Sequence, residues 1–165
     1  MITLQPITEE NFEDVLELKA SEAFVATNAY SMAEAYCDLK VAIENGEQYQ
    51  KHQYSIPFAI VNDETAVGFL MIGYEDGEDI NAGSDIYWLG RFMIDEKHQG
   101  KGYGKAAMKL VIDYVKSKPH GYDVKYIFTS VVPNNDVATK LYERMGFVKT
   151  GEQFYGEDLM RLVLY

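Results

Sequence analysis

A strand that leads through a glycine-rich loop into a helix constrains the fold of this chain most strongly. Gly100, Gly102 and Gly104 alternate with other residues between a strand expected at Ile86–Ile94 and a helix expected at Gly104–Ser117. Glycine lets a backbone adopt positive φ and approach an anion closely. The first turn of a helix adds N–H groups without intrahelical partners and about half a positive charge. The segment therefore predicts a phosphate site made of backbone N–H groups.

Two common nucleotide-binding motifs do not fit this spacing. A Walker A loop has four residues between its first glycine and a Gly-Lys pair that Ser or Thr follows, whereas only three separate Gly100 from Gly104, and Ala106 follows Lys105. A dinucleotide fingerprint reads G-x-G-x-x-G near a first strand, whereas this loop reads G-x-G-x-G late in the chain. Taken alone, the loop also fits a glycine-rich turn without a ligand.

Hydrophobic periodicity predicts strands and helices on both sides of the loop. Strands are expected at Ile2–Leu4, Pro57–Val61, Ala66–Tyr74, Ile86–Ile94, Tyr126–Val131, Phe147–Phe154 and Leu159–Tyr165, and further helices at Thr8–Lys19, Ser31–Gly46 and Asn135–Met145. Thr8 is the predicted N-cap of the first helix, and Ser31 with Glu34 forms a capping box for the second. Because no repeat or linker divides the chain, we expect one α/β domain, a mixed sheet with helices on both faces.

Charge is distributed unevenly along the chain. The formal net charge of -11 gives a field that repels nucleic acid and anionic membranes and attracts cations, although solubility alone also explains it. Tyr74–Asp85 holds five carboxylates and no base, whereas Arg91–Lys109 holds five bases and two carboxylates. The first stretch suits a cationic ligand or is a solvated, mobile hairpin loop, and the second suits an anion.

Other features of the sequence exclude several classes of protein. The single cysteine, Cys37, permits neither an intramolecular disulfide nor a cysteine-based metal cluster. His52, His98 and His120 lack metal-binding spacing. The start of the chain lacks the order of a signal peptide, and no apolar run approaches the length of a membrane span. We therefore expect a cytoplasmic protein with no metal and no nucleic-acid or membrane partner.

Two segments together resemble the GNAT superfamily of N-acetyltransferases. Gln99–Gly104 matches the coenzyme A loop Q/R-x-x-G-x-G/A, and Asn134–Phe147 is similar to the second signature, N-x-x-A-x-x-L-Y-x-x-x-G-F. The two occur in the family's order and at about its separation. The resemblance implies one GNAT domain over residues 1–165, of α+β type, with a mixed, mostly antiparallel sheet of about seven strands.

Within that superfamily, the chain most resembles bacterial spermine/spermidine (diamine) acetyltransferases of the Blt type. The residues that carry this likeness are Phe24–Asn28, Ser31, Tyr87–Asp95 and Gly102–Lys105. The resemblance implies acetyl transfer from acetyl-CoA to a primary amine, with a polyamine as the first expectation, and a homodimer. Alternatives left open are another small amine, an antibiotic or a protein N-terminus as acceptor, and a coenzyme A-binding regulator without turnover.

The resemblance also implies which residues form the site. It places the coenzyme on Phe92, Met93, Ile94, Gln99, Gly100, Lys101, Gly102, Tyr103, Gly104, Lys105, Asn135, Ala138 and Tyr142. The backbone of Met93 and Ile94 would pair with the pantetheine arm, and the N–H of Phe92 or Met93 would polarise the thioester carbonyl. Tyr142 would protonate the leaving thiolate, although it also fits a core aromatic. Asn135 also fits a helix N-cap.

The residues that bind the amine are less defined. Some polyamine acetyltransferases carry a glutamate as base on the central strand, but Tyr87–Arg91 holds no carboxylate. Expected substrate-binding residues are Glu22, Glu75, Asp85 and Tyr87. The three carboxylates also fit solvated surface charges, Tyr87 also fits the core, and water is an alternative proton carrier.

Overall fold

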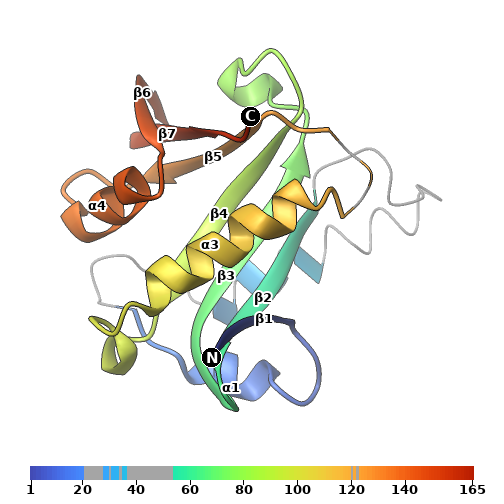
Figure 1. Cartoon of the computed structure of the whole chain (residues 1–165), viewed down its shortest axis with the longest axis vertical. Coiled ribbons are helices and arrows are strands. Elements are labelled where there is room, and N and C mark those ends of the chain that lie inside the picture. Colours follow the sequence, from blue (N-terminus) through green and yellow to red (C-terminus); the bar gives the residue numbers. More distant parts are fainter. Residues whose placement is uncertain (21–27, 30, 34, 37–53, 120, 122) are drawn as a thin grey trace.

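The computed structural model describes residues 1–20, 28, 29, 31–33, 35, 36, 54–119, 121 and 123–165. Its elements follow the chain in the order β1 (Ile2–Pro6), α1 (Phe12–Glu17), β2 (Tyr54–Asn62), β3 (Thr65–Glu75), η1 (Glu78–Ile80), β4 (Ile86–Ile94), η2 (Glu96–His98), α3 (Tyr103–Lys116), β5 (Tyr126–Val131), α4 (Asp136–Arg144), β6 (Val148–Phe154) and β7 (Glu157–Val163) (Figure 1). The described residues between 28 and 36 are also helical.

The strands form one mixed sheet. Its seven strands lie in the order β1-β2-β3-β4-β5-β7-β6. β4 and β5 are parallel, and the other neighbours are antiparallel. The expected fold class, a mostly antiparallel mixed sheet of about seven strands, is confirmed.

Helices cover both faces of the sheet. The amphipathic helix α3 lies across one face (Figure 1), where Ala107, Met108 and Val111 are buried in the main core. On the opposite face, Val15 of α1 and Ala35 pack with apolar residues of β2 and β3. Burial of apolar surface on both faces holds these layers together and fixes the position of β4 in the middle of the sheet.

A β-bulge in β4 changes which of its side chains face α3. Met71 pairs with Arg91, but the next residue, Ile72, pairs with Leu89, so Gly90 is the extra residue in the ladder. Side chains alternate between the faces of a strand, and one extra residue reverses that alternation. Consequently Leu89 before the bulge and Phe92 after it both pack against the main core, while Arg91 faces the other side.

The first two helices begin at residues other than those expected. Asn11, not Thr8, is the N-cap of α1. The Thr8 hydroxyl instead accepts from the Glu10 N–H (3.3 Å), and the Asn11 side chain accepts from the Thr8 N–H (2.9 Å), so a polar turn precedes the helix.

Ser31 is likewise not an N-cap, because Asn28 and Ala29 are already helical. Its buried hydroxyl accepts a hydrogen bond from Arg91 Nε (3.0 Å). Tyr36, expected on the apolar face of this helix, is exposed. Glu34, Leu39, Ile43 and Gly46 lie outside the described residues.

Candidate active site

The parallel strands β4 and β5 diverge in the middle of the sheet. Their pairing consists of Tyr87 with Ile127 and Trp88 with Phe128. Beyond these pairs, β4 continues towards the loop before α3 and β5 runs towards α4 (Figure 1). At the point of divergence, the buried Thr129 hydroxyl donates to the Leu89 carbonyl (2.9 Å) and fixes the two strands relative to each other.

Backbone groups of β4 remain on the side where pairing with β5 has ended. The Asp95 N–H donates to the Val67 carbonyl of β3 (2.9 Å). Because backbone groups alternate in direction along an antiparallel strand, those of Met93 point to β3, and those of Phe92 and Ile94 point to the β5 side. The Ile94 carbonyl accepts from the Gln99 side chain (3.0 Å), which leaves the Phe92 and Ile94 N–H groups as donors towards a ligand.

The loop after β4 presents the backbone N–H groups that the sequence predicts. Gly102 is the N-cap of α3, makes no side-chain cap, and accepts from the Ala106 N–H (3.1 Å). The N–H groups of Tyr103, Gly104 and Lys105 therefore have no intrahelical acceptor. Gly100 and Gly102 have positive φ, and a Cβ added to either would meet no atom within 4 Å. An open face of N–H groups at a helix N-terminus fits a diphosphate.

Gly104 lies where α3, α4 and β4 meet. A Cβ there would come within 3.4 Å of Leu141, 3.6 Å of Ile94 and 3.8 Å of Phe92. Glycine thus allows the first turn of α3 to approach the diverging end of β4. Lys101 and Lys105 are exposed at this loop and add positive charge around it.

Asp95 anchors the start of the loop. This buried carboxylate accepts from the Lys19 N–H and the Lys97 N–H (2.9 Å each). Burial alone would raise the pKa of Asp95, but the two backbone hydrogen bonds and the positive charges of His98 and Lys97 together lower the pKa below its usual value. The carboxylate joins the segment after α1 to the loop in its ionised form.

We expect Asp95→Asn to destabilise the fold by about 2 kcal/mol at pH 7, because an amide cannot accept both backbone hydrogen bonds with its two terminal atoms. The lowered pKa means that the ionised form stabilises the fold above the unfolded pKa of about 3.9, and this contribution is lost as pH falls through the folded pKa. Urea unfolding of both proteins between pH 7 and pH 3 measures the difference, which should narrow below about pH 4. Equal unfolding free energies at pH 7 would contradict this assignment.

Tyr142 lies in the core beside the divergent strands. It comes from α4, is 5% exposed, and its ring contacts those of Phe92 and Phe147, with centroids 6.4 and 5.4 Å away. Burial raises the pKa of Tyr142 to about 12; the charge of Glu157 adds to this effect and the Thr129 hydroxyl, a hydrogen-bond partner, reduces it. The phenol is therefore protonated at neutral pH and can act as a proton donor.

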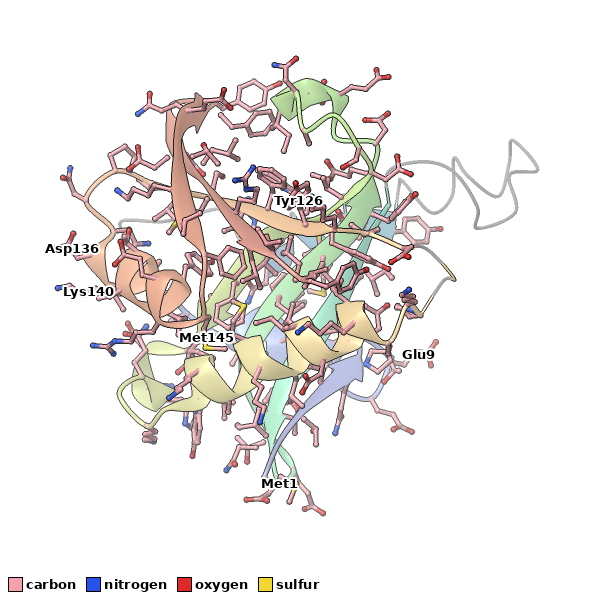
Figure 2. All side chains as sticks on the ribbon, turned by 45° about the horizontal axis from the view of Figure 1, so that its top comes forward. Met1, Glu9, Tyr126, Asp136, Lys140 and Met145 are labelled. Atoms are coloured by element: carbon pink, nitrogen blue, oxygen red, sulfur yellow. The ribbon has the colours of Figure 1, made fainter. Side chains whose placement is uncertain are left out.

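The other residues expected on α4 have structural roles at its start. Asn135 is the N-cap, and its side chain accepts from the Ala138 N–H (3.1 Å). A contact between Asn135 and a coenzyme would therefore use the Nδ2 donor. Ala138 packs against the main core, as does Met145 at the other end of the helix, whereas the exposed Asp136 and Lys140 lie on its outer side (Figure 2).

The residues expected to bind the amine are separated from this arrangement. Glu75 pairs with Ile86, at the end of β4 away from the glycine loop. Asp85 accepts from the Tyr74 hydroxyl (2.5 Å), and the buried Tyr87 ring packs edge-on against Tyr74.

The acidic loop that contains Asp85 is anchored to the fold. Ile80 of this loop is buried and packs against Ile86, Phe128 and Leu159. The loop also borders a depression of about 520 Å³. Glu22 lies outside the described residues.

A carboxylate that the sequence did not reveal lies near Tyr142. Glu157 begins β7 and accepts from the Ser130 hydroxyl (2.5 Å). The chain positions of Glu157 and Tyr142 gave no signal, since their proximity depends on the pairing of β5 with β7.

A model of the acetyltransferase (GNAT) family matches residues 12–147. The chain belongs to the GNAT family. It is 34% identical over 160 residues to the spermine/spermidine N(1)-acetyltransferase of Bacillus subtilis strain 168, covering 96% of both chains. A probable spermine N(1)-acetyltransferase of Bacillus subtilis subsp. natto is 33% identical, also with 96% of both chains covered.

A solved N-acetyltransferase structure shares the fold. An N-acetyltransferase from Thermoplasma acidophilum in complex with coenzyme A superposes with a TM-score of 0.65, at 18% identity, over 99% of both chains. The family match and the Bacillus relatives identify the chain as a GNAT N-acetyltransferase. Its glycine loop and α4 signature occupy one region of the fold. The described residues contain no cluster of three metal-ligating side chains. Among the described helices, none is long and apolar enough to span a membrane.

Proposed function

We propose that this GNAT protein transfers the acetyl group of acetyl-CoA to a primary amine of a polyamine such as spermine or spermidine. The arrangement of the N–H groups after Gly102, the divergent β4 strand and the buried Tyr142 supports the use of acetyl-CoA. The polyamine acceptor is supported by the two Bacillus relatives, because each match covers 96% of both proteins.

Backbone N–H groups and Tyr142 have separate roles in the proposed reaction. The N–H groups of Tyr103, Gly104 and Lys105 bind the diphosphate, and the N–H group of Ile94 binds the pantetheine arm. Acetyl-CoA supplies an activated thioester carbonyl when bound. The Phe92 N–H, directed to the side where β5 has diverged, polarises that carbonyl. Tyr142 holds the proton that the departing sulfur requires.

The acceptor must reach this site as a neutral amine. An alkylammonium with a pKa near 10.4 costs about 4.6 kcal/mol to deprotonate at pH 7. A low-dielectric site favours the neutral form of the reacting nitrogen. The carboxylates of the anchored loop 76–85, at the other end of β4, give the surface a negative charge that attracts a polyamine, whose other ammonium groups stay charged.

A panel of acceptors tests this proposal. We expect the kcat/KM for coenzyme A release, measured with a thiol reagent, to be at least about tenfold higher with spermine or spermidine than with an N-terminal peptide, because the acidic surface attracts polycations. The higher kcat/KM with polyamines should decrease towards that with the peptide as ionic strength rises, because salt screens the attraction. Coenzyme A release with the peptide but not with any polyamine would contradict the polyamine assignment, while the acetyltransferase activity would still stand.

A further inference from the structure

Glu157 and Tyr142 approach β5 from opposite faces of the sheet. Leu159 pairs with Ser130, and Glu157 is two residues before Leu159, so Glu157, Leu159 and Ser130 share one face. The neighbouring Thr129 points to the other face, where it donates to the Leu89 carbonyl where β4 and β5 diverge. Two consecutive residues of β5 thus contact the two groups from opposite faces of the sheet. Ser130 binds the Glu157 carboxylate, and Thr129 binds the Tyr142 phenol.

The electrostatics agree with this placement. Burial is the main cause of the raised pKa of Tyr142, and the negative charge of Glu157 adds to it. Such an effect requires the carboxylate and the phenol to lie close together. The Ser130 hydroxyl holds Glu157 Oε2 at 2.5 Å and limits the rotamers that the carboxylate can adopt. The carboxylate therefore has a fixed position relative to the proton donor.

Two aromatic side chains lie on the same face of the sheet as the Glu157 carboxylate. Phe154 pairs directly with Glu157 across the β6–β7 hairpin, and its ring packs edge-on against Trp88 of β4 at 5.2 Å. A half-buried carboxylate beside aromatic faces is suited to an alkylammonium group.

No cation of the described chain neutralises this charge. Among the residues with described positions, Glu157 forms no ion pair. Arg161, the base two pairs along on the same face, lies over the Tyr126 ring at 5.1 Å instead. A partly buried charge without a counter-charge is costly and is stabilised when a ligand supplies the opposite charge.

We propose that Glu157, positioned by Ser130, is the acceptor-site carboxylate that binds the charged nitrogen of the polyamine next to the reacting one, which is neutral when it attacks the thioester. This inference rests on the proposed function and assigns a residue to its acceptor site. It also explains selection for polyamines, because an acceptor without a second, charged nitrogen leaves Glu157 without a counter-charge.

Glu157→Gln tests the charge with little change of shape, since the Gln carbonyl still accepts from Ser130. We expect the KM for spermidine to rise about 10- to 100-fold, the range for loss of a charged hydrogen bond, with an unchanged Kd for acetyl-CoA. Asp158→Asn is the matched control. Asp158 is adjacent in β7, but its side chain faces the other side of the sheet and pairs with Lys149 at 2.8 Å. The spermidine KM of Asp158→Asn should therefore stay within about twofold of the wild-type value.

A second variant tests the role of Ser130. Ser130→Ala keeps the carboxylate but removes its hydrogen bond, and we expect the KM for spermidine to rise about 3- to 10-fold. An unchanged KM in this variant would overturn the positioning by Ser130.

Calorimetry of spermidine with the coenzyme A-saturated protein separates this inference from the proposed function. Binding that Glu157→Gln weakens and Asp158→Asn retains supports the assignment, whatever the rate of turnover. Intact turnover with unchanged spermidine KM and Kd in Glu157→Gln would overturn the role of Glu157 and leave the polyamine proposal standing. Neither binding nor turnover of any amine by the wild-type protein would overturn both.

Discussion

Tyr142→Phe is expected to lower kcat about 100-fold or more and to leave acetyl-CoA binding unchanged. General acid catalysis contributes about 10²- to 10⁴-fold, and phenylalanine keeps the buried ring while removing the proton that the sulfur would take. Steady-state coenzyme A release gives kcat, and calorimetry gives the Kd for acetyl-CoA. Because burial raises the pKa of Tyr142 to about 12, the wild-type kcat should show no fall below about pH 10 from loss of this proton.

Tyr114→Phe is the matched control. Tyr114 is a half-buried tyrosine of α3 whose ring packs edge-on against Phe58, away from the divergent strands. Loss of the Tyr114 hydroxyl should change kcat by less than about twofold. Equal kcat in Tyr142→Phe and the wild-type protein would remove the proton-donor role and leave Tyr142 as a core aromatic.

Gly102→Ala is expected to weaken acetyl-CoA binding by at least about tenfold. Gly102 has a φ of 82° at the N-cap of α3, and a left-handed conformation costs an L-residue about 1–2 kcal/mol. The loop can relieve that strain only by leaving the conformation that presents its N–H groups, and the new methyl group would project into the open face of the loop. Calorimetric titration of acetyl-CoA measures the loss.

Gly121→Ala separates strain from the loss of the coenzyme site. Gly121 follows the other end of α3 with a φ of 77°, and a Cβ there also meets no atom within 4 Å. It should lower the unfolding free energy by a similar amount, about 1–2 kcal/mol, without changing the Kd for acetyl-CoA. If both variants bind acetyl-CoA like the wild-type protein, the loop is not the diphosphate site.

Features encoded by local patterns were predictable from the sequence. The glycine loop follows from alternating glycines between a strand and a helix, and β5 was predicted at its observed bounds, Tyr126–Val131. The fold class followed from the order of periodic segments and from two signatures in one chain. Each of these signals is carried by residues close together in the sequence.

Features that depend on long-range pairing were not predictable. The bulge at Gly90 exists only relative to β3, and no local pattern distinguishes that glycine from one in a turn. Ser31 has the pattern of a capping box, yet its hydroxyl serves Arg91, a partner 60 residues away. Glu157 meets Ser130 through the β5–β7 ladder, so its place beside Tyr142 appears only in the folded chain.

The central claim is that the backbone N–H groups at the start of α3 bind the diphosphate of acetyl-CoA and direct its thioester to Tyr142. Amide hydrogen exchange of the wild-type protein with and without acetyl-CoA tests it most directly. The account predicts slower exchange at Tyr103, Gly104 and Lys105, and at Phe92 and Ile94 of β4. Unchanged exchange at all five amides under saturating acetyl-CoA would contradict it.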